Sequence, residues 1–310
     1  MIVKKKTKNK PSPKVAVVDI GSNSVRLVIY RKTGRHYDVV EDHKAECRLA
    51  EGMTHKAPRL HAMGQQKTLK TLTSFRDLLI RRKVNQVRAI GTAAMRAVAK
   101  TTAGQKFHHK AEAALGCKIK VISGRKEAEL TALGVMSSLP NAVGICGDLG
   151  GGSLELAQID HQTIFHTTTI PLGSLTLVSE SGHDVHQAQP LIQKRLSKQT
   201  WLTDIKGKNL YVIGGSWRAV GRVMMLQGDK AQPIHGYKIS AAKARPLLQK
   251  MVGQTPSSFQ TMGSKIKRRA DVIPWAAAVL LELVEICRPR AIVFSGHGVR
   301  EGLVLSSFKD

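Results

Sequence analysis

Two short segments, 129 positions apart, carry the same residue types in the same order. They are Asp19-Ile-Gly-Ser-Asn-Ser-Val-Arg-Leu27 and Asp148-Leu-Gly-Gly-Gly-Ser-Leu-Glu-Leu156. Each follows one apolar run and leads into another, which is typical of two β-strands joined by a tight turn. Glycine lets the backbone of a turn approach a phosphate group, whose oxygens can bind free N–H groups and serine hydroxyls. The repeat predicts two similar domains that hold one phosphate-bearing ligand from opposite sides.

The acidic residues of the two segments could bind a cation. Asp19 and Asp148 occupy matching positions, and Glu155 lies seven residues after Asp148, across the turn of the same predicted hairpin. Mg²⁺ in proteins is bound by a few carboxylates together with phosphate oxygens and water. We therefore expect Asp148 and Glu155, together with Asp19, to hold Mg²⁺ or another divalent cation. One glycine-rich hairpin could be purely structural, but two copies that share acid, glycine and serine favour a ligand site.

Three other charged residues stand where a phosphate site could use them. Glu127 lies at a predicted strand-to-helix junction, Ser123-Gly-Arg-Lys-Glu-Ala128. It could take a proton from an attacking water, although spacing alone favours a simple interaction with the helix dipole. Arg96 follows a predicted strand end, and Arg26 lies in the first hairpin. Each could clamp a phosphate or be an ordinary solvated arginine.

Other catalytic patterns are missing from the sequence. It contains no GxxxxGK[ST] loop, so it is not a P-loop NTPase. The twelve histidines lack the spacing of metal ligands, and no zinc site is expected. The glycine turns Gly214-Gly-Ser216 and Gly296-His-Gly298 also follow predicted strands, where packing turns and phosphate contacts are equally compatible with the pattern.

Composition bounds the class of protein. The 310 residues can form two domains with separate cores, and no apolar run approaches the ~20 residues of a membrane helix. The net charge of +27 favours a polyanionic partner or substrate, although a generally basic surface would give the same number. Aromatic residues make up only 4% and no zinc finger or RNA-recognition motif is present, so specific nucleic-acid binding is not expected. Four cysteines without CxxC spacing favour a reduced, cytoplasmic setting.

The predicted elements alternate between strands and helices, which indicates an α/β architecture. Residues 1–14 are predicted to be a disordered basic tail, because Pro11 and Pro13 interrupt a lysine-rich run. The stretch is not a signal peptide, because the apolar run after it is short and contains Asp19. We place an N-terminal domain at 15–126 and a C-terminal domain at 127–310.

The motifs together resemble a known family. The chain is similar to the exopolyphosphatase and guanosine pentaphosphate phosphohydrolase (Ppx/GppA) family, within the superfamily of actin, sugar kinases and heat-shock ATPases. Seven ordered motifs carry the resemblance and span nearly everything after residue 14: VAVVDIGSNSVRLVIY (15–30), GTAAMRAVA (91–99), VISGRKEAEL (121–130), GDLGGGSLELAQI (147–159), IPLGSLTL (170–177), LYVIGGSWRAVGR (210–222) and SGHGVREGL (295–303).

The resemblance implies a fold and a set of site residues. The fold would be two ribonuclease-H-like domains of the actin-like superfamily around a central cleft, in the short two-domain form of the family. Glu127 would be the catalytic base, Asp148 and Glu155 the metal-linked acids, and Arg96 an arginine that holds the phosphate chain. The phosphate-binding turns would be Gly21, Ser22, Asn23 and Ser24, with Arg26 beside them, and Gly150, Gly151, Gly152 and Ser153.

These residues and this resemblance predict a metal-dependent exopolyphosphatase that releases orthophosphate from the end of inorganic polyphosphate. Guanosine pentaphosphate is the alternative substrate. Two other classes stay open, an ATP-using kinase or ATPase of the same superfamily and a non-catalytic protein that binds polyanions or nucleic acid. No membrane partner is expected, and a homodimer is implied only by analogy with the family.

Overall fold

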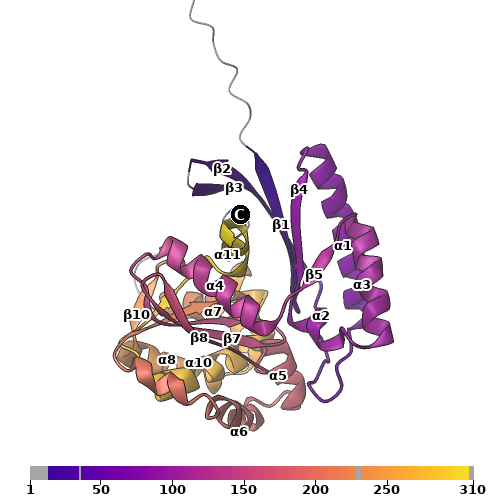
Figure 1. The fold of residues 1–310 in the computed structure, drawn as a ribbon. Coiled ribbons are helices and arrows are strands. Elements are labelled where there is room, and N and C mark those ends of the chain that lie inside the picture. The colour runs from indigo at the N-terminus through magenta and orange to yellow at the C-terminus, as the bar shows by residue number, and fades with distance from the viewer. Residues whose placement is uncertain (1–12, 35, 228–231, 307–310) are drawn as a thin grey trace, which may run out of the picture.

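The computed structural model describes residues 13–34, 36–227 and 232–306. Most of the basic tail predicted for residues 1–14 therefore lies outside the described residues. The remaining chain forms two sheets with helices around and between them (Figure 1).

The first sheet has the strand order β3-β2-β1-β4-β5. Its central strand β1 is buried on both faces, because successive side chains point to opposite faces and Ala16, Val17 and Val18 are all fully buried. The bounds of its strands are β1 Lys14–Ile20, β2 Ser24–Thr33, β3 His36–Glu46, β4 Gln86–Gly91 and β5 Ile119–Val121.

The second sheet has the order β10-β11-β9-β6-β7-β8 and repeats the topology of the first. In both sheets a central strand pairs antiparallel with the next strand along the chain and parallel with a later one. Strand β10 is an addition at the edge, antiparallel to β11. The bounds are β6 Val143–Leu149, β7 Leu154–Asp160, β8 Thr163–Ile170, β9 Asn209–Ile213, β10 Lys238–Ser240 and β11 Ala291–Phe294.

Helices cover the outer faces of both sheets. On the first sheet they are α1 Ala62–Arg81, α2 Ala93–Val98 and α3 Thr102–Leu115. On the second they surround α10, whose apolar sequence is buried almost all round. Helix α10 comprises Ile273–Cys287. Around it lie α5 Ser174–Glu180, α6 Val185–Leu196, α7 Gly215–Met225, α8 Ala241–Val252, α9 Ser264–Lys267 and the short 3₁₀ turns η1 Thr200–Ile205, η2 Pro256–Phe259 and η3 Ala270–Val272.

Two helices lie between the sheets, α4 (Gly124–Ser138) and α11 (Val299–Ser306) (Figure 1). Helix α4 packs on the second sheet, whereas Val304 of α11 joins a cluster with residues of β1 and β2 in the first. The two helices approach closely because glycines face the contact. A Cβ added to Gly302 would lie 1.8 Å from the Leu130 carbonyl oxygen, and one on Gly134 would lie 2.1 Å from that of Gly298.

The structure confirms most predicted elements and adds others. Both glycine turns join antiparallel strands, as the sequence predicts. Helices α2 and α3 are separate, with the break at Ala99–Thr101. Helix α6 ends at Leu196, and the 3₁₀ turn η1 follows it. Strand β10 was not predicted, because an edge strand of three residues carries almost no alternation. Helix α8 was not predicted either.

Candidate active site

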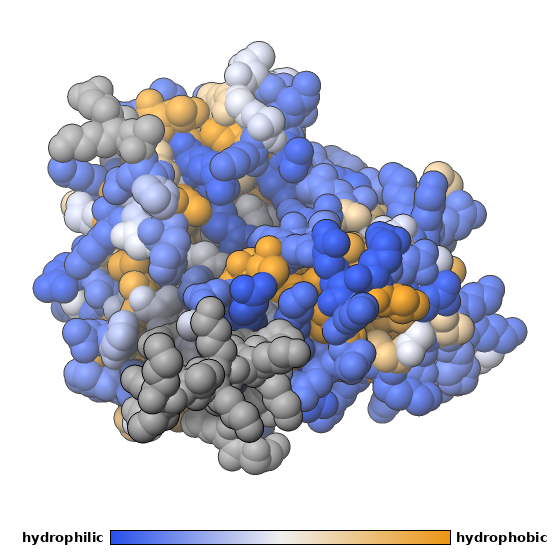
Figure 2. Space-filling model, turned by 90° about the horizontal axis from the view of Figure 1, so that it is seen from above, coloured by the Kyte–Doolittle hydropathy of each residue, from blue (hydrophilic) through white to orange (hydrophobic). Residues whose placement is uncertain are grey.

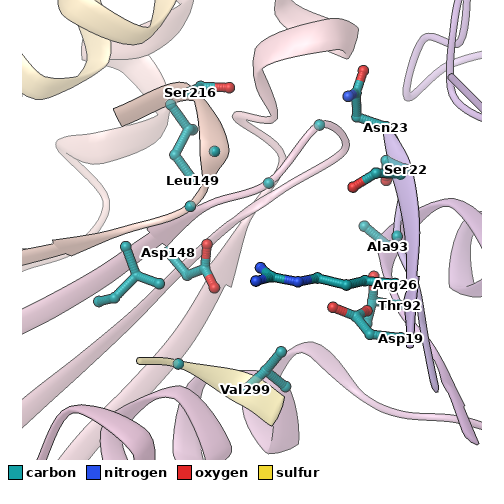
Figure 3. Close-up of a pocket in the computed structure, with 18 of the residues that line it drawn as sticks. Asp19, Ser22, Asn23, Arg26, Thr92, Ala93, Asp148, Leu149, Ser216 and Val299 are labelled. Atoms are coloured by element: carbon teal, nitrogen blue, oxygen red, sulfur yellow. The ribbon is translucent and has the colours of Figure 1, made fainter. Parts of the chain in front are cut away.

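The two glycine turns face each other across a cavity of about 110 Å³ between the sheets. Asp148 and Leu149 approach it from the second sheet, while Asp19, Ser22 and Asn23 approach it from the first (Figure 3). Eleven of the predicted site residues line this cavity: Asp19, Gly21, Ser22, Asn23, Ser24, Arg26, Glu127, Asp148, Gly150, Gly151 and Ser153.

The turns have matching geometry as well as matching sequences. In the first, the Gly21 N–H donates to the Ser24 carbonyl oxygen at 3.0 Å, and in the second the Gly150 N–H donates to that of Ser153 at 3.0 Å. The turns also touch, because a Cβ added to Gly152 would lie 2.7 Å from Ser22 Oγ. Gly152 thus belongs to the contact between the turns rather than to the cavity wall. The same sequence pattern produces both local arrangements, whereas their apposition is tertiary.

Arg96 lies behind the cavity and joins three of the predicted residues. Its Nη1 donates to Glu127 Oε2 at 2.9 Å and to the Ile122 carbonyl oxygen at 3.0 Å. Its Nη2 lies 3.3 Å from both Ser153 Oγ and Glu155 Oε1. The arginine therefore connects the predicted base to the second turn.

Glu155 is enclosed and does not reach the cavity. It is 1% exposed, and its Oε1 accepts from Ser153 Oγ at 2.6 Å and from Thr169 Oγ1 at 2.8 Å, besides the contact with Arg96. Strand pairing sets Asp148 directly opposite Glu155. The two acids are neighbours across the strands, yet only Asp148 faces the ligand space.

Burial raises the pKa values of the acids at this site. For Glu127 the pKa is well above its usual range, because burial and the nearby Glu155 charge outweigh the attraction of Arg96. Burial raises the pKa of Glu155 to about 7, against hydrogen bonds from Ser153 and the charge of Arg96. Burial likewise raises the pKa of Asp148 to about 6, against the charges of Arg218 and Arg300. A nearby positive charge would favour the ionised forms of these buried acids.

Asp19 is held by the last helix. Arg300 Nη1 donates to Asp19 Oδ2 at 3.0 Å, and Arg300 belongs to the first turn of α11. The next residue, Glu301, accepts from Tyr30 Oη at 3.0 Å and from the Gly298 N–H at 2.8 Å. This network ties the first turn of the site to the end of the chain.

A cluster of three or more acidic, histidine or cysteine side chains able to hold a metal is not found among the residues that the structure describes. Asp19 is engaged by Arg300, and Glu155 by Ser153, Thr169 and Arg96. Asp148 faces the cavity, and within the described ranges its side chain makes no hydrogen bond. Mg²⁺ commonly takes one or two carboxylates and completes its shell with phosphate oxygens and water. The donor set fits a metal held by Asp148 and the substrate.

The structure brings four basic residues to the site that the predicted set does not include: Lys44, Arg218, Arg269 and Arg300. Arg218 and Arg300 each follow a glycine turn at a strand end, which is a usable signal for a ligand site. Arg269 and Lys44 have no such signal. The Asn23 amide faces Arg269, whose Nη1 and Nη2 lie 2.7 and 2.8 Å from its oxygen in the orientation that satisfies both groups.

Two sheets of one topology, with paired glycine turns over acids and arginines, form a site suited to a phosphate-bearing ligand. The model of the Ppx/GppA phosphatase family matches residues 28–310, and the chain belongs to this family. The family and fold indicated by the seven motifs are thereby confirmed.

The chain is similar to relatives of two kinds, some named as exopolyphosphatases and others as guanosine-5'-triphosphate,3'-diphosphate pyrophosphatases. It is 26% identical to exopolyphosphatase 2 of Mycobacterium tuberculosis over 94% of this chain and 98% of that protein. It is 24% identical to guanosine-5'-triphosphate,3'-diphosphate pyrophosphatase of Aeromonas salmonicida over 94% of this chain. The chain spans 59% of the length of that second relative.

A solved structure shares the fold over nearly the whole chain. An exopolyphosphatase from Cytophaga hutchinsonii superposes with a TM-score of 0.85 at 20% identity, covering 96% of this chain and 98% of that one. A Ppx/GppA enzyme of Aquifex aeolicus gives a TM-score of 0.76 at 22% identity, covering 96% and 100%.

The face of the molecule seen in Figure 2 is mostly hydrophilic, with apolar residues in small separate groups. Among the helices of the described residues, none combines the length and the apolar character needed to cross a bilayer.

Proposed function

We propose that the protein is an exopolyphosphatase, which hydrolyses the terminal phosphoanhydride bond of inorganic polyphosphate and releases orthophosphate. The family and the paired phosphate turns support hydrolysis of a phosphoanhydride. A reduced, cytoplasmic setting belongs to the proposal, supported by the four cysteines, which are all free thiols.

We choose polyphosphate as the substrate because of a groove that continues from the cavity, called the basic groove below. Its wall contains seven basic and two acidic side chains: Arg26, Lys44, Arg218, Arg222, Lys265, Arg268 and Arg269, with Asp42 and Glu46. Four of the basic side chains also line the cavity: Arg26, Lys44, Arg218 and Arg269. A groove of this sign attracts a long chain of phosphates more strongly than a single small anion.

The chain's own residues suit an in-line attack by water on the terminal phosphorus. In its ionised form, Glu127 would position the water and accept its proton. Arg96 holds Glu127 in place and neutralises part of its charge. The N–H groups of the turns, with the Ser24 hydroxyl, would bind the oxygens of the phosphoryl group in transfer, on which charge builds up. The Ser153 hydroxyl already donates to Glu155 and helps to fix the second turn.

A divalent cation such as Mg²⁺, held by Asp148 and the substrate, would neutralise charge on the terminal phosphates. The remaining predicted metal acids have other partners. Asp19 is paired with Arg300, and Glu155 fixes Ser153, Thr169 and Arg96. We therefore assign Glu155 a positioning role in the proposed mechanism, with the metal held mainly by Asp148.

Guanosine pentaphosphate is the second candidate substrate, because one relative is named for hydrolysis of that class of nucleotide. It carries a short phosphate chain and would fill the cavity without needing the outer part of the basic groove.

The deciding experiment measures phosphate release with Mg²⁺ from long-chain polyphosphate and from guanosine pentaphosphate. The wild type is compared with Glu127→Gln and with Glu129→Gln. Glu129 is the matched control, since it lies on the same helix, is 42% exposed in its side chain and pairs with Lys126. We expect Glu127→Gln to lose about 10²–10⁴-fold in turnover, the usual contribution of a general base, and Glu129→Gln to keep its activity.

Preference for the nucleotide would overturn the choice of polyphosphate, and full turnover by Glu127→Gln would overturn the assigned base. Release of ADP from ATP without release from polyphosphate would place the protein with the kinases and ATPases of the fold.

A further inference from the structure

Lys44 stands where the cavity opens into the basic groove. It belongs to β3 and lines both spaces, together with Arg26, Arg218 and Arg269. These four side chains come from β2, β3, α7 and the turn before η3, so the junction is built from segments far apart in the sequence.

The pairing of Lys44 is unfavourable for stability. Strands β2 and β3 set it directly opposite Arg26. Like charges in such cross-strand positions repel one another. Arg26 is relieved by its ion pair with Asp42, and Arg269 by contacts with Asn23 and Glu46. Among the described residues, no ion pair relieves Lys44 or Arg218. A phosphate chain in the groove would supply the missing negative charge.

The surroundings of Lys44 also lower the pKa of its side chain. Lys44 is an exposed residue that lines the groove, and the surrounding wall removes part of the water from its side chain. This desolvation, followed by repulsion from Arg269, lowers the pKa of Lys44 to about 8, and Glu46 opposes the effect only in part. Arg218 and Arg26 add further repulsion. The other charged groups that line the groove are Asp42, Arg222, Lys265 and Arg268.

We propose that Lys44 binds the phosphate chain where it leaves the cavity, and that binding there takes up a proton on its Nζ at alkaline pH. This inference rests on the proposed function for the identity of the chain. The sign follows from the charges. Well below pH 8 Lys44 is already protonated, so binding does not change its protonation. Above it the free protein has a neutral amine, and the bound phosphates favour its ammonium form.

The test is calorimetric binding of medium-chain inorganic polyphosphate in EDTA, repeated in buffers of different ionisation enthalpy at about pH 6.5 and about pH 9. The protein is the full chain as wild type, Lys44→Arg, Lys44→Gln and, as matched control, Lys120→Arg, at an exposed lysine of β5. If binding restores an ordinary lysine pKa, the wild type takes up about 0.9 of a proton more than Lys44→Arg at the higher pH. At the lower pH we expect no difference.

Affinity gives an independent readout. Lys44→Arg keeps its charge, so it should bind about tenfold more tightly than the wild type at about pH 9 and equally well at about pH 6.5. Lys44→Gln should bind more weakly than the wild type at the lower pH, and Lys120→Arg should follow the wild type throughout. Equal proton uptake by the wild type and Lys44→Arg, or an unchanged affinity of Lys44→Gln, would overturn the proposal.

Binding in EDTA does not depend on turnover, so the two proposals can fail separately. Proton-coupled binding without hydrolysis under Mg²⁺ would reject the exopolyphosphatase and keep the role of Lys44. Hydrolysis of polyphosphate without proton uptake that depends on Lys44 would keep the exopolyphosphatase and reject the role of Lys44.

Discussion

Arg96 would act on the proposed chemistry only through the residues that it holds in place. It does not line the cavity, yet it contacts Glu127 of α4 and both Ser153 and Glu155 of the β6–β7 hairpin. A carboxylate that works as a base must be held at one distance from its water. Arg96 supplies that constraint for Glu127, and Glu155 supplies it for Arg96.

Glu155→Gln tests this arrangement. The variant keeps the size of the side chain but weakens its bonds with Ser153, Thr169 and Arg96. Hydrogen bonds to charged groups contribute about 1.5–3 kcal/mol, so we expect kcat to fall about 10- to 100-fold with a smaller change in KM. Steady-state kinetics measure the split. A change confined to KM would show that Glu155 does not position the base.

The acid limb of the pH profile gives a second test at the residue scale. Because burial and Glu155 raise the pKa of Glu127, this proposed base is protonated at pH values where an ordinary glutamate is ionised. We expect kcat/KM to rise with pH over a window above the usual carboxyl range. In Glu155→Gln the neighbouring charge is gone, and this limb should move to lower pH. A limb that stays in place would assign the titration to another group, such as Asp148.

At the scale of elements, the contact between α4 and α11 positions both sides of the site. Helix α4 carries Glu127, and α11 carries Arg300, which holds Asp19. The glycines of this contact leave no room for a side chain. The helices must therefore stay in one register for the base and the first turn to face the same cavity.

We expect Gly302→Ala to destabilise the protein, because its methyl group would overlap the Leu130 carbonyl oxygen. Overpacking of this kind costs typically about 1–3 kcal/mol, read from denaturant unfolding. Gly253→Ala is the control, because a Cβ there would meet no atom closer than 3.8 Å. Similar unfolding midpoints for the two variants would show that the helices can separate without loss.

At the scale of the whole molecule, part of the +27 charge is concentrated on one groove beside the cavity. The basic groove has Arg222, Lys265 and Arg268 on its wall outside the cavity. A long chain can reach these side chains while its end lies at Glu127, whereas a very short chain cannot.

Arg222→Ala should therefore raise KM for long-chain polyphosphate several-fold and leave KM for tripolyphosphate nearly unchanged. Added salt should reproduce the difference, because it screens charges beyond about 8–10 Å. Activity assays with both substrates at low and high salt measure the effect. Equal losses for the two substrates would mean that Arg222 acts on the cavity or on the fold.

The sequence by itself determined the paired hairpins, because strand alternation and glycine turns are set by residues close together in the chain. It also supplied the order of motifs that identifies the family, and eleven of the residues that line the cavity. The match of Asp19 with Asp148 is visible without a structure, and their turns then adopt the same hydrogen bond.

Only the tertiary structure decided how these residues are used. Spacing could not show that Glu155 faces Arg96 and two hydroxyls, or that Arg300 holds Asp19. Lys44 and Arg269 carry no local signal, and they reach the site because β3 and the turn before η3 pack beside it. Local patterns fix elements, whereas burial, pKa values and ion pairs depend on which distant segments pack together.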